Sequence, residues 1–305
     1  MVKQPAPLQL GNTVGIMCPA GFMPIERTEA CVQSLQDWGY QALLGDTLYS
    51  RSTTYFSGTD AERAHDLQHM LDDDSIRAIL FGRGGYGMTR IIDRLDFARF
   101  LQNPKWIAGY SDITVLLAHL YTQYGIASMH SPMAGAFADQ PADPIYLPSI
   151  RTLFAGERMD YTVASHALNR CGEASGPLLG GNLALFTHLI GTSSFPNLDG
   201  AILFLEDVGE QLYNIDRMLR QLKCGGHLDR LSGLIFGGFT DCKDTDRPFG
   251  QDLPEILQAI VQESHYPVCY DFPVSHTPRN YALKYGVTCR MRIAPDAVRL
   301  QEISE

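Results

Sequence analysis

A strict alternation of short apolar runs with segments of helical period is the feature that most constrains this chain. Residues 13–18 (TVGIMC) predict a strand, and Cys31, Leu35 and Trp38 share one face of the helix expected next. Further strands are expected at 41–44, 76–81 and 105–110, and the helices that alternate with them are expected at 61–71, 88–100 and 112–124. Strands that alternate with helices predict an α/β fold, in which a parallel sheet is covered on both faces.

The alternation is interrupted between residues 139 and 176, where Pro141, Pro144 and Pro148 occur and polar residues dominate. We therefore predict an α/β domain over 1–160, a linker over 161–176 and a C-terminal domain over 177–305. In the second half, helices are expected at 182–190 and around 215–222, strands at 201–205, 231–236 and 267–270, and an antiparallel meander across 287–300.

Composition excludes several classes of protein. The 305 residues carry 24 basic and 34 acidic side chains, a formal charge of -10. No stretch gathers the Lys and Arg that a nucleic acid requires, and no apolar run approaches the ~20 residues of a membrane span. The first ten residues lack the apolar core of a signal peptide, which predicts a cytoplasmic location. The seven cysteines contain no CxxC pair, so we expect reduced thiols and no zinc site.

The segment 82–87 (GRGGYG) follows an expected strand and satisfies the dinucleotide-binding pattern GxGxxG. Asp112 lies about where that pattern places its ribose-binding acid. A dinucleotide-dependent oxidoreductase is therefore one alternative, although its glycine loop normally follows the first strand of the domain. Here a strand, a helix and a second strand come before it. A purely structural turn is another alternative.

Ser111 stands between an extended run (WIAGY) and a strongly helical one (ITVLLAHLY). Such a sharp turn exposes the hydroxyl, as in the nucleophile elbow of hydrolases. The helix start favours a developing oxyanion, with the Asp112 amide as one donor and Gly84 or Gly85 as the source of a second. The competing interpretation is that Ser111 or Asp112 only caps the helix. Ile113 also replaces the last glycine of GxSxG.

A nucleophilic serine needs a base, and the base needs an orienting acid. His276 follows an expected strand (PVCYDF) in a loop that two prolines stiffen, and His130 is the reserve candidate. Glu206 and Asp207 both end an apolar strand (AILFL), and strand parity does not choose between them, because both faces of that strand are apolar. Base and acid would then come from the second domain, with the site in the cleft between the domains.

Five ordered motifs resemble the LD-carboxypeptidases, the serine peptidases known as murein tetrapeptide carboxypeptidases. They are GRGGYG (82–87), GYSDIT (109–114), GGNLA (180–184), LFLEDVGE (203–210) and DFPVSH (271–276). The resemblance implies an N-terminal flavodoxin-like parallel-sheet domain, a C-terminal swivelling β/β/α domain and a homodimer.

The same resemblance implies site residues. Ser111 would be the nucleophile, His276 the base and Glu206, rather than the neighbouring aspartate, its partner. The implied oxyanion donors are the amides of Asp112 and Gly85. No metal or cofactor is implied.

We also expect Arg83, Gly84 and Asn182 to contact the substrate. The family often has glycine just before the catalytic histidine, whereas this chain has Ser275.

The reaction implied is hydrolysis of the bond between an L-configured centre of diaminopimelate or lysine and the terminal D-alanine of a murein tetrapeptide. A cytoplasmic enzyme of this kind would recycle wall fragments. The resemblance also covers microcin-immunity peptidases, which cleave nucleotide conjugates and would need an aromatic residue to stack on the base.

Overall fold

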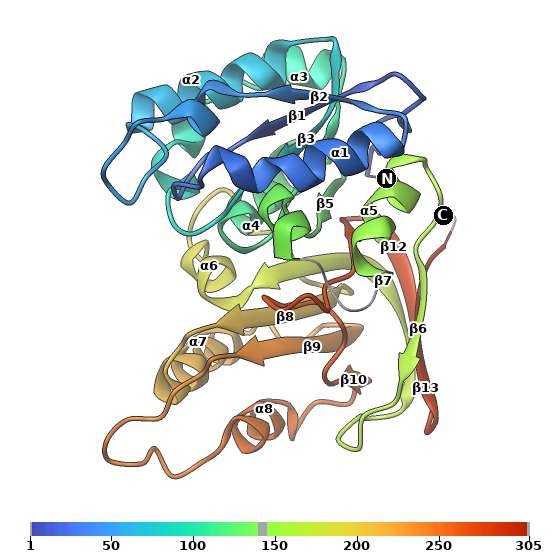
Figure 1. Ribbon diagram of the computed structural model, residues 1–305. Helices are drawn as coiled ribbons and strands as arrows, with labels where there is room; N and C mark the ends of the chain where they lie inside the picture. Colours follow the sequence, from blue (N-terminus) through green and yellow to red (C-terminus); the bar gives the residue numbers. More distant parts are fainter. Residues whose placement is uncertain (1, 140–144, 304–305) are drawn as a thin grey trace.

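Two sheets, one above the other in Figure 1, form the framework of the protein. The computed structural model describes residues 2–139 and 145–303, so Pro141 and Pro144 of the interrupted segment lie outside it. Within the described residues no helix is long and apolar enough to cross a membrane. All seven cysteines are free.

The N-terminal sheet has the order β11-β5-β4-β3-β1-β2. Its five parallel strands are β1 (Thr13–Met17), β2 (Gln41–Leu44), β3 (Ile76–Phe81), β4 (Trp106–Ala108) and β5 (Ser128–His130). The order 2-1-3-4-5 is that of flavodoxin-like folds, which bind ligands outside the carboxyl ends of the strands. The expected parallel sheet is therefore confirmed.

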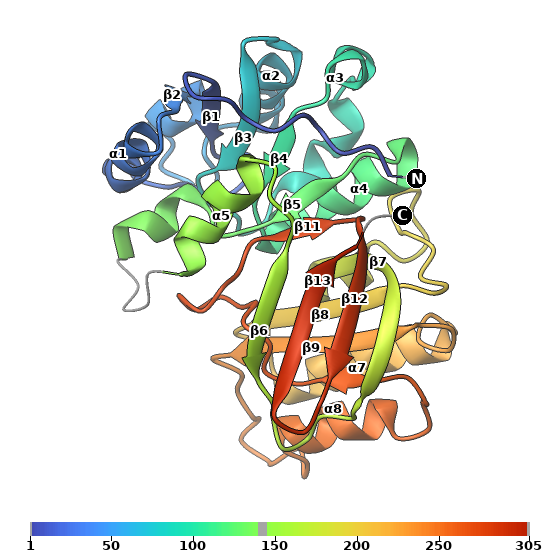
Figure 2. The ribbon, with the colours of Figure 1, turned by 90° about the vertical axis from the view of Figure 1, so that its right-hand side faces the viewer.

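Helices surround this sheet (Figure 2). They are α1 (Glu29–Asp37), α2 (Asp60–Asp72), α3 (Ala98–Gln102), α4 (Thr114–Tyr124) and α5 (Tyr146–Phe154). A capping box of Thr59 and Glu62 starts α2, and Gly125, with φ +62°, ends α4 in the left-handed conformation that glycine tolerates.

The prediction of one helix over 88–100 is wrong. The structure has two 3-10 turns, Met88–Arg90 and Ile92–Arg94, followed by the short α3. The Asp96 side chain accepts a hydrogen bond from Ala98 N (2.8 Å), and Asp96 N donates to the Gln68 side chain (2.8 Å). These bonds replace helical backbone bonds, which is why aspartate tends to interrupt helices.

The C-terminal sheet has the order β10-β9-β8-β7-β12-β13-β6. Its parallel half comprises β7 (Gly172–Asn182), β8 (Ile202–Val208), β9 (Gly233–Thr240) and β10 (Val268–Cys269), and α6 (Leu183–His188), α7 (Leu212–Cys224) and α8 (Leu253–Val261) belong to that half. The strands β12 (Thr288–Ile293) and β13 (Ala297–Glu302) form the expected meander.

The segment predicted as a linker, 161–176, lies largely in this second sheet. Most of β6 (Asp160–Ala164) and the start of β7 fall inside it, and β6 pairs with β13 at the sheet edge. Residues along β6 alternate between exposed and half-buried. Its polar composition therefore reflects an edge strand that faces solvent, which composition alone does not distinguish from a linker.

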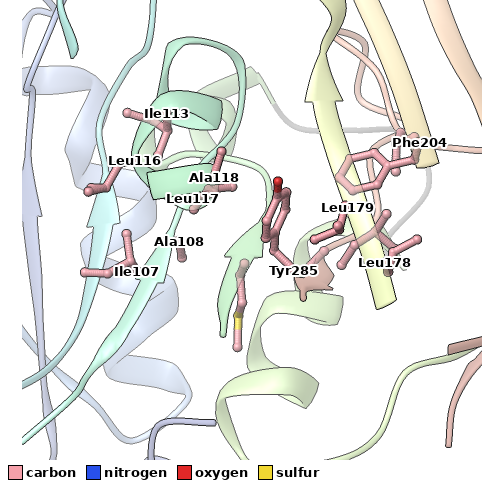
Figure 3. Packing of buried hydrophobic residues seen from close by; sticks show 14 of the residues in the cluster. Ile107, Ala108, Ile113, Leu116, Leu117, Ala118, Leu178, Leu179, Phe204 and Tyr285 are labelled. Carbon is pink, nitrogen blue, oxygen red and sulfur yellow. The ribbon is translucent and has the colours of Figure 1, made fainter. Parts of the chain in front are cut away.

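The two domains are joined by β11 (Leu283–Tyr285), which leaves the C-terminal domain and pairs antiparallel with β5. Figure 3 shows the Tyr285 ring between Leu117 of the first domain and Leu179 and Phe204 of the second. These residues belong to one continuous buried cluster. The carboxyl ends of β4 and β8 are thus held in a fixed relation by a shared apolar core.

Candidate active site

Ser111 occupies a strained turn between β4 and α4. Its φ is +61°, and among the described residues only Asp241 and Asp271 are other non-glycine residues with positive φ. This conformation costs a residue with a Cβ roughly 1–2 kcal/mol. The residues at the two N-cap positions, Tyr110 and Ile113, make no side-chain capping bond. A left-handed residue at the junction of a strand and a helix is the backbone geometry of a nucleophile elbow.

The glycine loop after β3 touches this turn, because β3 and β4 are neighbours in the sheet. A Cβ on Gly84 would lie 3.1 Å from Ser111 Cβ and 3.3 Å from the Asp112 nitrogen. Gly85 has φ +99°, and a Cβ there would collide with the Tyr55 hydroxyl. Because neither residue carries a side chain, the glycine loop can pack closely against the serine turn. The backbone of 84–85 therefore lies near Asp112, the predicted oxyanion donor.

The Asp112 side chain is fully buried and accepts a hydrogen bond from Met88 N (2.7 Å). Burial raises the pKa of Asp112 to about 6, against the lowering effect of the Met88 and Gly87 amides. This carboxyl group fastens the end of the glycine loop to the serine turn. A carboxylate that is fully buried is not accessible to a ribose hydroxyl, which disfavours the dinucleotide alternative.

Glu206 and His276 form a hydrogen-bonded pair in the second domain. The distance between His276 Nδ1 and Glu206 Oε2 is 2.6 Å, with Glu206 fully buried at the end of β8 and His276 15% exposed. Burial lowers the pKa of His276, but the charge and hydrogen bond of Glu206 outweigh it, so the pKa is raised overall. The His276 ring lies against the ring of Tyr110, the residue that precedes Ser111 in the chain, with ring centroids 4.8 Å apart.

Asp207 has a different environment from Glu206. Its carboxylate accepts hydrogen bonds from Asn182 Nδ2 (2.8 Å), Ala184 N (2.9 Å) and Val208 N (2.8 Å). Burial raises the pKa of Asp207 to about 6, and these donors oppose the rise. Asp207 therefore holds the start of α6 in place, while Glu206 holds the histidine.

Asn182, expected to contact substrate, caps α6 by accepting a hydrogen bond from Leu185 N (3.1 Å). Its backbone N–H donates to Thr114 Oγ1 (3.2 Å) of the first domain. In this structure its side chain is thus bonded within the protein, at the joint between the domains.

His130, the reserve base, is fully buried at the end of β5. Its ring lies 5.7 Å from the Tyr110 ring and 5.1 Å from the Phe204 ring, measured between centroids. Burial lowers the pKa of His130 to about 4. Because substrate cannot reach it, His130 is a poor candidate for the base.

Two hollows meet at Tyr110. One of about 380 Å³ is lined by Arg27, Arg83 and Asp139 among others, and one of about 90 Å³ is lined by His276. Tyr110 and Asp139 border both. Arg83 donates to the Phe22 carbonyl (2.6 Å), and Arg27 pairs with Asp139 (2.8 Å).

Sequence reasoning missed Tyr55 and Tyr110. The only signal for Tyr110 was its position beside the serine, and Tyr55 comes from a distant loop, so no local pattern could have identified it.

Comparisons with known proteins identify the family of this chain. Family models described as the LD-carboxypeptidase N-terminal and C-terminal domains match residues 14–131 and 175–291. A probable murein peptide carboxypeptidase of Bacillus subtilis is 33% identical over 294 residues, covering 95% of this chain and 92% of that protein. The microcin C7 self-immunity protein MccF of Escherichia coli is 29% identical, covering 92% of this chain and 91% of that protein.

Among solved structures, the muramoyltetrapeptide carboxypeptidase of Oxalobacter formigenes superposes with a TM-score of 0.87 at 26% identity, covering 96% of this chain and 99% of that one. Fold and sequence together define a two-domain serine-type peptidase, a class of hydrolase. The chain belongs to the LD-carboxypeptidase family.

Proposed function

We propose that this protein is a serine carboxypeptidase that releases the terminal D-alanine of a murein tetrapeptide by cleaving an L,D peptide bond. The observation that carries the proposal is the 2.6 Å hydrogen bond between His276 Nδ1 and Glu206, together with a serine in left-handed backbone whose neighbour Tyr110 packs against the His276 ring. The names of the Bacillus subtilis and Oxalobacter formigenes relatives support a murein peptide as substrate.

In the proposed mechanism His276 is the general base. Because its Nδ1 is bonded to Glu206, the other ring nitrogen, Nε2, accepts the Ser111 proton as Ser111 Oγ attacks the scissile carbonyl. Glu206 fixes this tautomer and stabilises the imidazolium that forms. His276 then protonates the amine of the leaving D-alanine, and a water molecule that it deprotonates hydrolyses the acyl-enzyme.

The backbone amides of Asp112 and Gly85 are the proposed oxyanion donors. The contact between Gly84 and the serine turn supports this role, because it brings the glycine loop to the start of the helix. Removing one such donor typically costs about 10²–10³ in kcat. A backbone amide has the advantage of a fixed position, which side-chain donors achieve only through further packing.

Arg83 is the proposed partner of the substrate's terminal carboxylate, since it lines the larger hollow beside Tyr110. Asn182 stays a predicted substrate contact, which requires its amide to exchange its bond with Asp207 for one with substrate.

The proposal is tested by measuring free D-alanine after incubation with a murein tetrapeptide. The tetrapeptide ending in L-alanine is the control substrate, and Ser111→Ala is the control protein. We expect release from the D-alanine substrate only, and none by the variant. Cleavage of an aminoacyl sulfamoyl adenosine in place of the tetrapeptide would move the assignment to the microcin-immunity activity suggested by MccF.

The proposed place of action is the cytoplasm, where the enzyme would recycle wall fragments, and cell fractionation tests this. The homodimer stays a prediction, which light scattering of the purified protein tests.

A further inference from the structure

Glu206 has one oxygen for which the structure provides no donor. Its Oε2 accepts from His276, whereas Oε1 is buried and has no hydrogen-bond partner among the described residues. A buried carboxylate oxygen without a donor carries a large desolvation cost, so native proteins nearly always supply one. The neighbouring side chains therefore indicate how this acid is kept ionised.

His130 is the neighbour with unused donor capacity. It is fully buried, and neither ring nitrogen has a hydrogen-bond partner of normal geometry among the described residues, while the nearby Asn280 side chain acts on the ring as an acceptor and raises its pKa. Its ring meets Phe204 edge-on, with centroids 5.1 Å apart. Phe204 and Glu206 are two residues apart on β8, which stays in regular register with β7, and the register shift against β9 at this point adds its extra residue to β9. Alternation along β8 therefore places both side chains on the same face of the strand. His130 thus faces the side of β8 from which Glu206 projects.

The surroundings keep the His130 ring neutral. Burial lowers its pKa to about 4, the positive charge of His276 acts in the same direction, and Glu206 and Asn280 oppose them. Tyr110, between the two histidines, is itself neutral because burial raises its pKa. A neutral imidazole carries one N–H donor and one acceptor nitrogen. His130 can therefore donate to a carboxylate without bringing a second positive charge to the site.

We propose that His130 is a positioning residue, which donates its ring N–H to Glu206 Oε1 through one bridging water molecule. This bond keeps Glu206 ionised and aimed at His276, while the Tyr110 ring packs between the two imidazoles. The inference rests on the proposed function, because it assigns His130 a role in orienting the base.

The test compares His130→Phe, which keeps a ring without the N–H, with His130→Gln, which keeps an N–H donor. His119→Phe is the matched control, since His119 lies in α4 and its ring forms a hydrogen bond with Ser194 instead of with the site. We expect His130→Phe to lower kcat about tenfold to hundredfold with little change in KM. In the pH profile of kcat/KM of this variant, the acid limb should move to higher pH, because a Glu206 carboxylate without a donor to Oε1 binds protons more tightly. His130→Gln should stay within about threefold of the parent enzyme.

A His130→Phe enzyme with the kcat and acid limb of His119→Phe would overturn the proposal, as would a His130→Gln enzyme impaired as much as His130→Phe. If His130→Phe does not fold, nitrogen NMR of the parent enzyme decides. We expect a neutral His130 ring at pH 6 whose N–H signal shifts in Glu206→Gln, and an imidazolium would contradict us. Ser111→Ala separates the two claims, since its activity in the same assay would refute the proposed function itself.

Discussion

The two domains prepare their parts of the site in different ways. The first domain uses backbone: a left-handed serine and a glycine loop at the ends of adjacent parallel strands. The second uses side chains, a buried acid that holds a partly exposed imidazole. Backbone geometry at a sheet edge survives most substitutions, whereas a buried charge pair depends on every neighbour. We therefore expect the second domain to be the more sensitive to substitution beyond the reacting groups.

The largest effect is expected in the first domain, at the nucleophile. Ser111→Ala should lower kcat by about 10⁶, the cost of losing a triad nucleophile in a well-studied serine protease. The fold should persist, since alanine removes only the hydroxyl oxygen and leaves the backbone of the turn unchanged. D-alanine release and thermal unfolding measure the two properties. Retention of a tenth of the activity would exclude Ser111 as nucleophile.

The next effect separates two adjacent carboxylates of the second domain. Glu206→Gln should lower kcat by about 10⁴, because the base loses the acid that fixes its tautomer. Asp207→Asn should change kcat less than tenfold but destabilise the fold by about 1–3 kcal/mol, because Asp207 accepts bonds from Asn182 and the start of α6. Steady-state kinetics with urea unfolding would show both, and the reverse pattern would exchange their roles.

A smaller effect is expected where the domains meet. Gly181 has φ +128°, and a Cβ there would lie 2.5 Å from Thr114 Oγ1. Gly181→Ala should push the domains apart and lower kcat/KM about tenfold to hundredfold, because small misplacements of reacting groups are costly. Gly200→Ala is the control, since Gly200 also has positive φ (+72°) but nothing within 4 Å. Equal kcat/KM for the two variants would show that the joint does not set the catalytic geometry.

The pH dependence of His276 tests the buried pair itself. Glu206 raises the pKa of His276 above its ordinary value of 6.5, so the neutral base form appears only at higher pH and activity falls as pH drops through the raised value. In Glu206→Gln, burial is opposed only by the smaller effect of the Asp207 charge, so the His276 pKa should fall well below its value in the parent enzyme. NMR titration of the ring in a Ser111→Ala background measures both values, and equal titrations would refute the pairing.

The smallest effect concerns stability. The pKa of His130 is about 4 when folded, against the ordinary 6.5, so the unfolded chain binds an extra proton between these values. His130 should therefore make unfolding free energy rise with pH across this interval, and His130→Gln should remove that part of the slope. Urea unfolding at pH 4.5 and 7 compares the two proteins. An unchanged slope would mean that His130 is charged in the folded state.

The sequence predicted well those features that local patterns encode. Continuous apolar runs such as residues 76–81 became strands with their expected bounds, because both faces of a parallel sheet are buried. The sharp turn expected at Ser111 is present as a left-handed residue.

Features that depend on distant contacts were not predictable. Parity could not separate Glu206 from Asp207, because only the fold shows which one faces His276. The broken helix at 88–100 depends on a bond from Asp96 to Gln68, and the Tyr55 contact with Gly85 comes from another loop.

The most direct test of the account is a search for the acyl-enzyme. A depsipeptide analogue with D-lactate in place of D-alanine should acylate faster than the enzyme deacylates, so that the intermediate accumulates. We predict a stoichiometric burst of D-lactate and a tripeptidyl adduct on Ser111 in acid-quenched peptide maps. Release of D-lactate that is linear from the start, with no adduct on Ser111 and with an undiminished rate in Ser111→Ala, would contradict an acyl-enzyme mechanism.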